Sequence, residues 1–503
     1  MTQEGIDYRL SEFRYSDGTT RILYLWDQTL RPSAQSEDSN SERAEEESDA
    51  GAEQEVRRAP EGFTLGVEFN AEQINQALMA PDGQQFQLLP SVDTSGHGTA
   101  VAGIAAGSSD TYQGVAPEAT LLIVKLGLPD ATSFPRTTEI MRAVTYAVNK
   151  AIELQMPLVI NLSFGNTYGA HDGSSLLERF LDNAAEIGRT VICVGSGNEG
   201  ASDGHLSGNL LTDQDGVQRS GQAGRGALGG AAGRAVSVEL SVAAYERNLN
   251  VQLWKNYSDV YHITLRSPGG QEFPLPEAVE GGKYTLRLEQ TEILVYIGEP
   301  TPYSVSQEIY LEFLPLGRNY INGGIWSFRL EPVEIVTGNY YFYLPSSTVR
   351  SQGTGFYRST PDVTLTIPST AAKVITVGAY DSTYDAYADF SGRGYADTER
   401  TIGVVSAGLA KPDLVAPGVG ILAPDIYGGY TPVTGTSFAT PIVAGSAALL
   451  EEWGIVRGND VFLYGEKVKA YLRKGTRALR GEEEYPNDRV GWGALCVNDS
   501  LPE

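Results

Sequence analysis

The spacing of apolar residues divides the chain into two kinds of segment. Between residues 120 and 197, continuous apolar runs alternate with segments in which apolar residues recur every three or four positions. A continuous run of this length is typical of a strand buried on both faces, and the three-to-four-residue spacing is typical of an amphipathic helix. The pattern predicts strands in residues 120–127, 157–165 and 190–197, and helices in residues 137–154 and 175–187.

This order of elements predicts an α/β fold. Strand, helix and strand at this spacing imply right-handed crossovers and a mostly parallel sheet flanked by helices. The same pattern resumes at residues 371–380, "AAKVITVGAY", and continues to an apolar segment with helical spacing in residues 438–453.

Between these two α/β stretches the pattern changes to short runs of alternating apolar and polar residues. Strands are expected in residues 235–243, 250–255, 284–290, 292–298, 307–315, 325–333 and 339–345. Many short strands separated by turns are typical of an antiparallel sandwich or jelly roll. Stretches rich in Gly and Ser, residues 204–234 and 346–360, are expected to be linkers. We therefore predict one α/β domain, residues 1–204 and 361–503, with a jelly-roll-like insertion in residues 205–360.

Charge and length limit the possible partners. The chain has 503 residues, with 37 basic and 63 acidic side chains and a net charge of −26. This balance argues against nucleic acid and anionic membranes as partners, and no apolar run is long enough to cross a bilayer. Many of the acidic residues lie within residues 33–60, which lack an apolar pattern and are expected to form a disordered surface loop.

Cysteines and the amino-terminal residues exclude little more. The two cysteines, Cys193 and Cys496, lie far apart and indicate neither a disulfide framework nor a metal cluster, so no metal or cofactor is expected. The first residues, "MTQEGIDYRL", lack the sections of a secretory signal. The compartment stays open: the protein remains inside the cell, leaves by another route, or begins upstream of this sequence.

The stretch "TPVTGTSFATPIVAGSAALLEEW", residues 431–453, places Ser437 between a Gly-Thr turn and a helical run. At a helix N-terminus, unpaired N–H groups and the helix dipole stabilise negative charge on a substrate oxygen. Pro441 is expected in the first turn of the helix, where its missing N–H costs little. Ser437 is therefore a candidate nucleophile. The alternative is that it only caps the helix.

Two further residues have matching chemistry. His97 lies between glycines at the start of a predicted helix, "SGHGTAVAGIAAG", where a base is rigidly held yet reachable; the alternative is a structural histidine. Asn198 follows a buried strand in "VICVGSGNEG", where its amide could donate to an oxyanion or only serve a turn. The remaining histidines lie in polar or strand contexts and are expected to have no chemical role: His171, His205 and His262.

Taken in order, these motifs resemble those of the subtilisin-like serine peptidases. The matching segments are "GHGTAVAGIAAG" around His97, "NLSFG" at residues 161–165, "SGNEG" around Asn198 and "GTSFATPIVAG" around Ser437. Within this group the chain is most similar to the clostridial Csp-type germination peptidases, through "GIDYRLSEFRYSDGTTRILYLWDQ", "FSGRG" and "NDRVGWGALCVNDSLP". The resemblance covers nearly the whole chain apart from the acidic loop.

The resemblance implies a serine endopeptidase that cleaves protein or peptide substrates through an acyl-enzyme and that acts as a processing protease. Ser437 would be the nucleophile and His97 the base, while Asn198 and the backbone N–H of Ser437 would hold the oxyanion. Residues Ser163, Phe164 and Gly165 would pair with the substrate backbone as an added strand. A cytoplasmic or spore-associated location follows from the resemblance alone.

One member of the expected triad is not matched. The family places an aspartate that orients the histidine where this sequence has Gln3, and the strand that should precede it is absent. Either an active peptidase is incomplete at its N-terminus, or the chain is a catalytically impaired pseudoprotease with a binding or regulatory role. Loss of this charge costs about 10⁴ in turnover in a serine protease. Asp27, in "RILYLWDQT", is a third possible source of the carboxylate.

Overall fold

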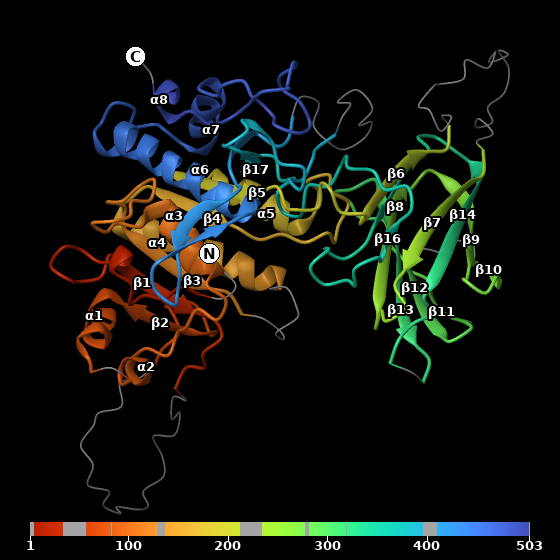
Figure 1. The fold of residues 1–503 in the computed structure, drawn as a ribbon, viewed down its shortest axis with the longest axis horizontal. Coiled ribbons are helices and arrows are strands. Elements are labelled where there is room, and N and C mark those ends of the chain that lie inside the picture. The colour runs from red at the N-terminus through yellow and green to blue at the C-terminus, as the bar shows by residue number, and fades with distance from the viewer. Residues whose placement is uncertain are drawn as a thin grey trace, which may run out of the picture.

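The computed structural model describes residues 5–33, 57–81, 83–127, 136–211, 234–276, 281–317, 319–395 and 410–501. Figure 1 shows an α/β part that contains the labelled helices, on the left, and a β-sandwich on the right. Gln3 and most of the predicted acidic loop, residues 34–56, lie outside the described residues.

The α/β part contains the mostly parallel strands that the apolar runs predict. In one sheet β1 (Ile22–Asp27) runs parallel to β3 (Leu121–Lys125) and antiparallel to β2 (Val67–Asn70). The other sheet has the parallel strands β4 (Leu158–Leu162), β5 (Thr190–Gly195), β17 (Ile375–Asp381) and β19 (Leu414–Pro417), with β18 (Ala386–Tyr387) antiparallel at its edge. No described strand pairs with both β3 and β4, so the two sheets remain separate.

Helices cover both faces of the second sheet. On β5, Ile192 and Val194 pack in the core formed with α4 (Thr137–Leu154) and α5 (Leu176–Ala185), while Val191 and Cys193 face α6 (Thr436–Glu451) and α7 (Gly465–Lys474). Burial on both faces explains why this strand is a continuous apolar run. The other elements of this part are η1 (Ser11–Phe13), α1 (Ala71–Met79), α2 (Gln85–Leu88), α3 (His97–Ala106), β20 (Ile421–Pro424), β21 (Tyr430–Val433), η2 (Glu452–Val456) and α8 (Val497–Ser500).

The inserted segment folds as two antiparallel sheets, which confirms the predicted class of fold. One sheet has the order β10 (Glu272–Pro274), β9 (Val260–Arg266), β14 (Gly324–Glu334), β7 (Val236–Val242) and β16 (Gly355–Phe356). The other has the order β11 (Lys283–Leu288), β12 (Thr291–Ile297), β13 (Ser306–Pro315), β8 (Leu249–Asn256), β15 (Asn339–Tyr343) and β6 (His205–Asn209). Apolar side chains from both sheets form one core, in which Phe313 and Trp326 pack edge to face.

The two segments expected to be linkers contain strands. β6 pairs with β15, and β16 pairs with β7, so one edge strand of each sheet consists of residues that the Gly- and Ser-rich composition marked as connections. The composition is misleading here because each of these short strands adds a single apolar residue to the core, Leu206 or Phe356, and also hydrogen-bonds to a partner strand distant in sequence. Residues 212–233 of the first segment lie outside the described residues.

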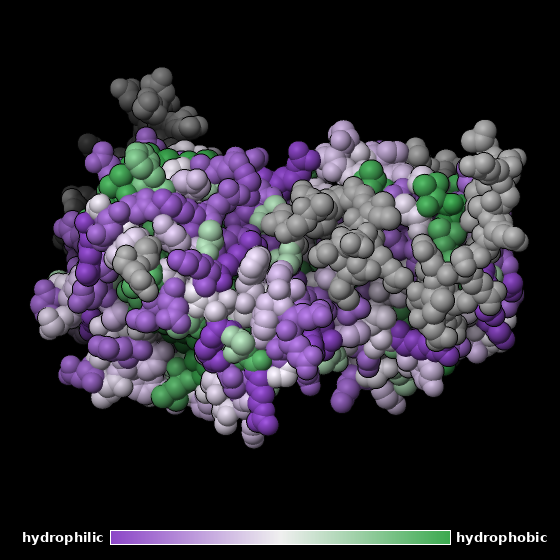
Figure 2. All heavy atoms as spheres, turned by 90° about the horizontal axis from the view of Figure 1, so that it is seen from above, coloured by the Kyte–Doolittle hydropathy of each residue, from purple (hydrophilic) through white to green (hydrophobic). Residues whose placement is uncertain are grey.

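One face of the molecule shows how polar and apolar residues are distributed on the surface. Seen from above, the coloured residues are mostly hydrophilic, and hydrophobic ones form separate small patches (Figure 2). Among the described helices, none is both long enough and apolar enough to span a bilayer.

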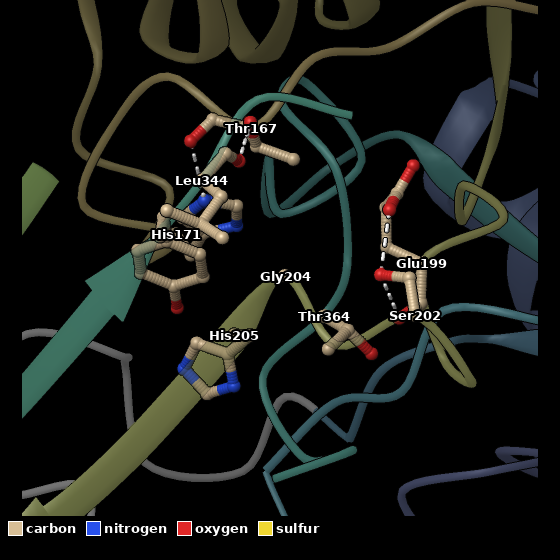
Figure 3. A pocket seen from close by; sticks show the side chains of 9 residues that line it. Thr167, His171, Glu199, Ser202, Gly204, His205, Leu344 and Thr364 are labelled. Atoms are coloured by element: carbon tan, nitrogen blue, oxygen red, sulfur yellow. Dashed lines mark hydrogen bonds between the residues drawn. The ribbon is translucent and has the colours of Figure 1, made fainter. Parts of the chain in front are cut away.

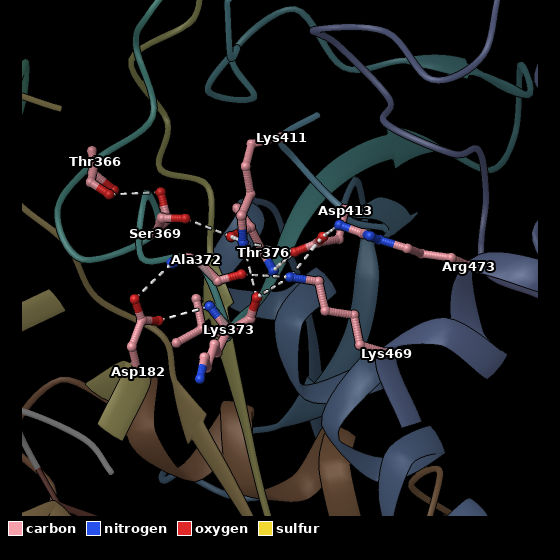
Figure 4. Close-up of polar contacts among 11 residues, drawn as sticks. Asp182, Thr366, Ser369, Ala372, Lys373, Thr376, Lys411, Asp413, Lys469 and Arg473 are labelled. Atoms are coloured by element: carbon pink, nitrogen blue, oxygen red, sulfur yellow. Dashed lines mark hydrogen bonds and ion pairs between the residues drawn. The ribbon is translucent and has the colours of Figure 1, made fainter. Parts of the chain in front are cut away.

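A buried charge cluster fastens α7 to the second sheet (Figure 4). The fully buried Asp413 accepts from Lys411 at 2.8 Å, lies 3.1 Å from Lys469 of α7, and contacts Arg473 on the same helix. Burial by itself would raise the pKa of Asp413, but the three cations outweigh it and hold this pKa well below its usual value. The carboxylate is therefore charged, and removing it would leave the buried Lys411 and Lys469 and the partly exposed Arg473 without their shared counter-ion.

We predict that Asp413→Asn lowers the free energy of unfolding by about 3–5 kcal/mol, because breaking a buried ion pair leaves its partners uncompensated. Urea denaturation would measure the loss. The matched control is Glu292→Gln, which breaks a more exposed pair with Arg287 and is expected to cost less than about 1 kcal/mol. Equal effects of the two substitutions would contradict this role for the cluster.

Candidate active site

Ser437 is the second residue of α6, and the residue that caps this helix is Gly435. Gly435 has φ of 149°, a conformation that favours glycine, and no side chain caps the helix. The alternative in which Ser437 is only the N-cap is therefore wrong. Its side chain is half-buried at the N-terminal end of α6, where backbone N–H groups lack helical partners.

Pro441 lies inside α6 and not in its first turn, which corrects the sequence-based expectation. A helical N–H normally bonds the carbonyl four residues earlier, so a proline at 441 leaves the Ser437 carbonyl without that bond. The Ser163 hydroxyl donates to this carbonyl at 2.8 Å. In return, the Ser437 hydroxyl donates to the Ser163 carbonyl at 3.2 Å. These two reciprocal bonds join the start of α6 to the end of β4.

The residues that follow β4 form a short segment that hydrogen bonds hold at both ends. Ser163 is almost fully buried, and its hydroxyl also accepts from the Asn161 amide at 2.9 Å. Asn166 and Ile367 exchange backbone hydrogen bonds of 3.0 and 2.8 Å. A Cβ at Gly165 would collide with Thr366, so this position requires glycine. Residues 163–165 are thus fixed at both ends of a short extended run.

His97 is the first residue of α3, and Asp93 holds the loop that leads to it. The Asp93 carboxylate accepts from the backbone N–H of Gly96 at 2.8 Å and of Thr99 at 2.9 Å, and from the Thr99 hydroxyl at 2.7 Å. The His97 ring packs edge-on against Phe438, with ring centroids 5.5 Å apart. The imidazole is therefore held beside the residue that follows Ser437.

Asn198 is exposed at the end of β5, and its amide is oriented by α6. Its side-chain oxygen accepts from the backbone N–H of Thr436 at 3.0 Å and from the Thr436 hydroxyl at 3.1 Å. Because the oxygen is engaged, the amide nitrogen is the group left to face outward, close to Gly435. The carboxamide thus presents donors at the start of the helix that carries Ser437.

Four predicted site residues converge where loops meet the ends of β4, β5, α3 and α6: His97, Ser163, Asn198 and Ser437. The carboxyl ends of the parallel strands of the second sheet lie here, and open α/β sheets place their sites at these ends. Sequence reasoning missed the contributions of Asp93 and Pro441. The pattern "DTSGHGT" contains a signal for Asp93, since an acidic residue shortly before a helix commonly binds its first N–H groups.

Asp27 is engaged elsewhere. It is fully buried at the end of β1, where its carboxylate accepts from the backbone N–H of Thr29 at 2.8 Å and the Ser91 hydroxyl at 2.7 Å. Lys125 lies 3.7 Å away. These contacts involve both carboxylate oxygens, and among the described residues none of them is with His97. The structure therefore gives Asp27 a structural role.

Two histidines that were expected to be inert lie at the junction with the β-sandwich. His171 and His205 stack on opposite sides of Tyr343, with ring centroids 3.9 and 4.5 Å apart. They help line a small pocket, which does not include Ser437, His97 or Asn198 (Figure 3). The lining residues are Thr167, His171, Glu199, Ser202, Gly204, His205, Tyr343, Leu344 and Thr364.

The surroundings of His205 oppose its protonation. Nδ1 bonds the Thr360 carbonyl at 3.1 Å, whereas Nε2 is buried and has no hydrogen-bond partner among the described residues. Burial lowers the pKa of His205 to about 3. His171, by contrast, faces carbonyl oxygens with both ring nitrogens, at 2.5 Å from Leu365 and 3.1 Å from Thr167, although burial also lowers its pKa.

Comparison with known proteins gives two matches that cover most of the chain. The model of the subtilase family matches residues 29–295 and 337–493. The solved structure of the CspB protease of Clostridium perfringens has a TM-score of 0.81 and 30% sequence identity, and covers 99% of this chain and 91% of that one. These matches confirm the resemblance indicated by the motifs.

Curated relatives match over shorter parts of their length. The serine protease AprX of Bacillus subtilis is 35% identical over 159 residues, which are 28% of this chain and 32% of that protein. The PIII-type proteinase of Lactococcus lactis is 26% identical over 392 residues, 74% of this chain and 19% of that protein. The chain thus spans about a third or less of these two relatives. None of the comparisons supports the pseudoprotease alternative.

We predict that His205 makes the fold sensitive to acid. The unfolded chain takes up a proton near pH 6.5, whereas the folded chain resists it to about pH 3. Stability is therefore retained above pH 6.5 and lost as the pH falls, by up to about 1.4 kcal/mol per pH unit. Urea denaturation between pH 7 and pH 4.5 would show a shallower loss for His205→Asn than for the wild type. The control, His262→Asn on the exposed face of β9, should follow the wild type; identical slopes for all three would contradict the prediction.

Proposed function

Because the chain belongs to the subtilase family of serine peptidases, we propose that Ser437, His97 and Asn198 carry its hydrolysis of peptide bonds. The observation that supports this most strongly is the reciprocal pair of bonds between Ser437 and Ser163. Beside it, Thr436 holds the Asn198 oxygen, so the nitrogen donors of this amide face outward. A hydroxyl, an oxyanion donor and a strand for the substrate then lie at one sheet edge. Proteins or peptides are the substrates of this family.

In the proposed mechanism the Ser437 oxygen attacks the scissile carbonyl while His97 takes its proton. The acyl-enzyme forms as His97 returns the proton to the leaving amine, and water then repeats the sequence to release the acid. In the structure the Ser437 hydroxyl points to the Ser163 carbonyl. It has to turn toward the imidazole when substrate binds, in keeping with catalytic hydrogen bonds that tighten only in the substrate complex.

The oxyanion would be held by two donors, the Asn198 amide and the backbone N–H of Ser437. The second donor is unpaired in the helix because it lies in the first turn of α6. The helix dipole adds positive potential at the same point. Thr436 keeps the Asn198 oxygen turned away from the substrate, so no reorganisation is needed when charge develops.

Residues Ser163, Phe164 and Gly165 would bind the substrate backbone by strand addition. When the Ser437 hydroxyl turns to His97, the Ser163 carbonyl loses its donor, and a substrate N–H can replace it. The same rotation would therefore prepare the nucleophile and open a backbone acceptor for the substrate.

We propose that the carboxylate that orients His97 lies in the space between β3 and β4. Each of these strands has one edge without a partner among the described strands, and α4 joins them as a crossover does in a continuous sheet. Gly5 lies against the Lys125 side chain at the carboxyl end of β3. A carboxylate beside Gly5 would thus lie on the same side of the sheet as Ser437 and Asn198. Asp27 is unsuitable because its oxygens are already engaged.

A fluorophosphonate probe is expected to label Ser437, and Ser437→Ala should abolish the labelling because the attacking oxygen is gone. His97→Ala should slow labelling by at least about 10³-fold, since the hydroxyl then lacks its base. Intact-mass and peptide mass spectrometry would locate the label. The matched control is Ser446→Ala, which removes another hydroxyl of α6 and should leave labelling unchanged. A folded wild-type chain that stays unlabelled would overturn the proposed mechanism.

Asn198→Ala is expected to lower kcat by about 10²–10³ with little change in KM, because the lost donor acts on the transition state. This magnitude is that of the corresponding change in subtilisin, a member of the same family. Steady-state hydrolysis of a fluorogenic peptide would measure it. Asn459→Ala, a change at an exposed loop amide, serves as the control. A loss below about threefold would exclude Asn198 as an oxyanion donor.

A further inference from the structure

Glu199, the residue after Asn198, is almost fully buried and its carboxylate is held by several donors. Its exposed fraction is 6%. One oxygen accepts from the Ser346 hydroxyl at 2.6 Å, and the other accepts from the Ser202 hydroxyl at 2.7 Å. The backbone N–H of Ser347 lies 3.4 and 3.3 Å from the two oxygens. Figure 3 shows Glu199 and Ser202 joined at one side of the pocket.

The donors to Glu199 come from two parts of the molecule. Ser202 belongs to the same loop as Asn198, whereas Ser346 and Ser347 lie between β15 and β16 of the β-sandwich. A backbone bond from Leu344 to the Gly204 carbonyl, 2.9 Å, joins the same two segments. The loop that carries the oxyanion donor is therefore fastened to the insertion directly beside that donor.

We propose that Glu199 is a positioning residue through which the inserted β-sandwich keeps the Asn198 amide aligned with the developing oxyanion. This inference rests on the proposed role of Asn198. Hydrogen bonds to a buried carboxylate are about twice as strong as neutral ones, so they restrain the loop firmly. Asn198 itself is exposed, and its other restraint is Thr436 on α6. The Glu199 bonds fix the loop backbone, while Thr436 fixes the side chain.

The position of the amide matters because oxyanion stabilisation depends on short distances. A displacement of about 1 Å can cost about 100-fold in rate even when it arises outside the reacting groups. If the hydrogen bonds to the Glu199 carboxylate were weakened, the adjacent Asn198 could shift by such a distance. The insertion would then control the rate of the chemical step without contacting the substrate.

The test is Glu199→Gln, which keeps the shape of the side chain and removes its charge. We expect kcat on a fluorogenic peptide to fall between about 10-fold and about 100-fold, with KM changing less than about twofold. The rate constant for fluorophosphonate labelling of Ser437 should fall in parallel. In an Asn198→Ala background, Glu199→Gln should change these rates less than about twofold, because the residue acts through Asn198.

Ser346→Ala provides a second variant that leaves the Glu199 charge in place and removes one donor supplied by the sandwich. It is also expected to lower kcat. In the Asn198→Ala background it should change kcat as little as Glu199→Gln does. This variant decides the matter if Glu199→Gln does not fold. The control is Ser306→Ala, which removes a different bond across the same junction, from the Ser306 hydroxyl to Asp172 at 3.1 Å, and should leave kcat within about twofold.

The outcomes separate this inference from the proposed function. If the wild type is labelled at Ser437 and Asn198→Ala is slow, but the Glu199 and Ser346 variants are as fast as the wild type, the inference is overturned and the mechanism stands. Additive losses in the Asn198→Ala background, with a lowered melting temperature, would show a general structural role and also overturn it. Absence of labelling in the wild type would overturn both.

Discussion

The reciprocal hydrogen bonds between Ser437 and Ser163 are the contact on which the site depends. They exist because a proline inside α6 leaves one carbonyl without its helical donor, and a serine hydroxyl at the end of β4 occupies it. These bonds fix the position of the helix that carries the hydroxyl relative to the segment that would bind the substrate. Asn198 is hydrogen-bonded to Thr436 of the same helix, so its position relative to Ser437 is fixed as well.

Helix starts supply most of the electrostatics at this sheet edge. Ser437 and His97 both lie within the first two positions of a helix, where N–H groups are unpaired and the dipole is positive. The backbone N–H groups themselves supply this positive potential. Asp93 accepts from the Thr99 N–H of α3, and Asn198 accepts from the Thr436 N–H of α6, whereas the Ser437 N–H is the donor proposed for a substrate oxygen.

The β-sandwich makes polar contacts with two loops of the α/β part, those that follow β4 and β5. Thr167, shortly after the substrate segment, donates to the Leu344 carbonyl at 2.7 Å, and Glu199 accepts from Ser346. Such contacts cross between units that each have a separate apolar core. These hydrogen bonds fix the geometry of the junction. Because burial lowers the pKa of His205, the stability of the junction is expected to depend on pH.

The local sequence determined the order of the elements, the class of fold and the candidate residues. Helix and strand spacing is a property of neighbouring positions, so α4 was predicted at residues 137–154 and is observed there, and the motifs around His97, Asn198 and Ser437 mark element ends. Tertiary structure decided which groups meet. The partners of Ser437, Pro441 and Glu199 lie in segments distant in sequence, and β6 and β16 exist only because a sheet edge accepts them. No local pattern encodes such pairings, because they depend on the packing of the whole chain.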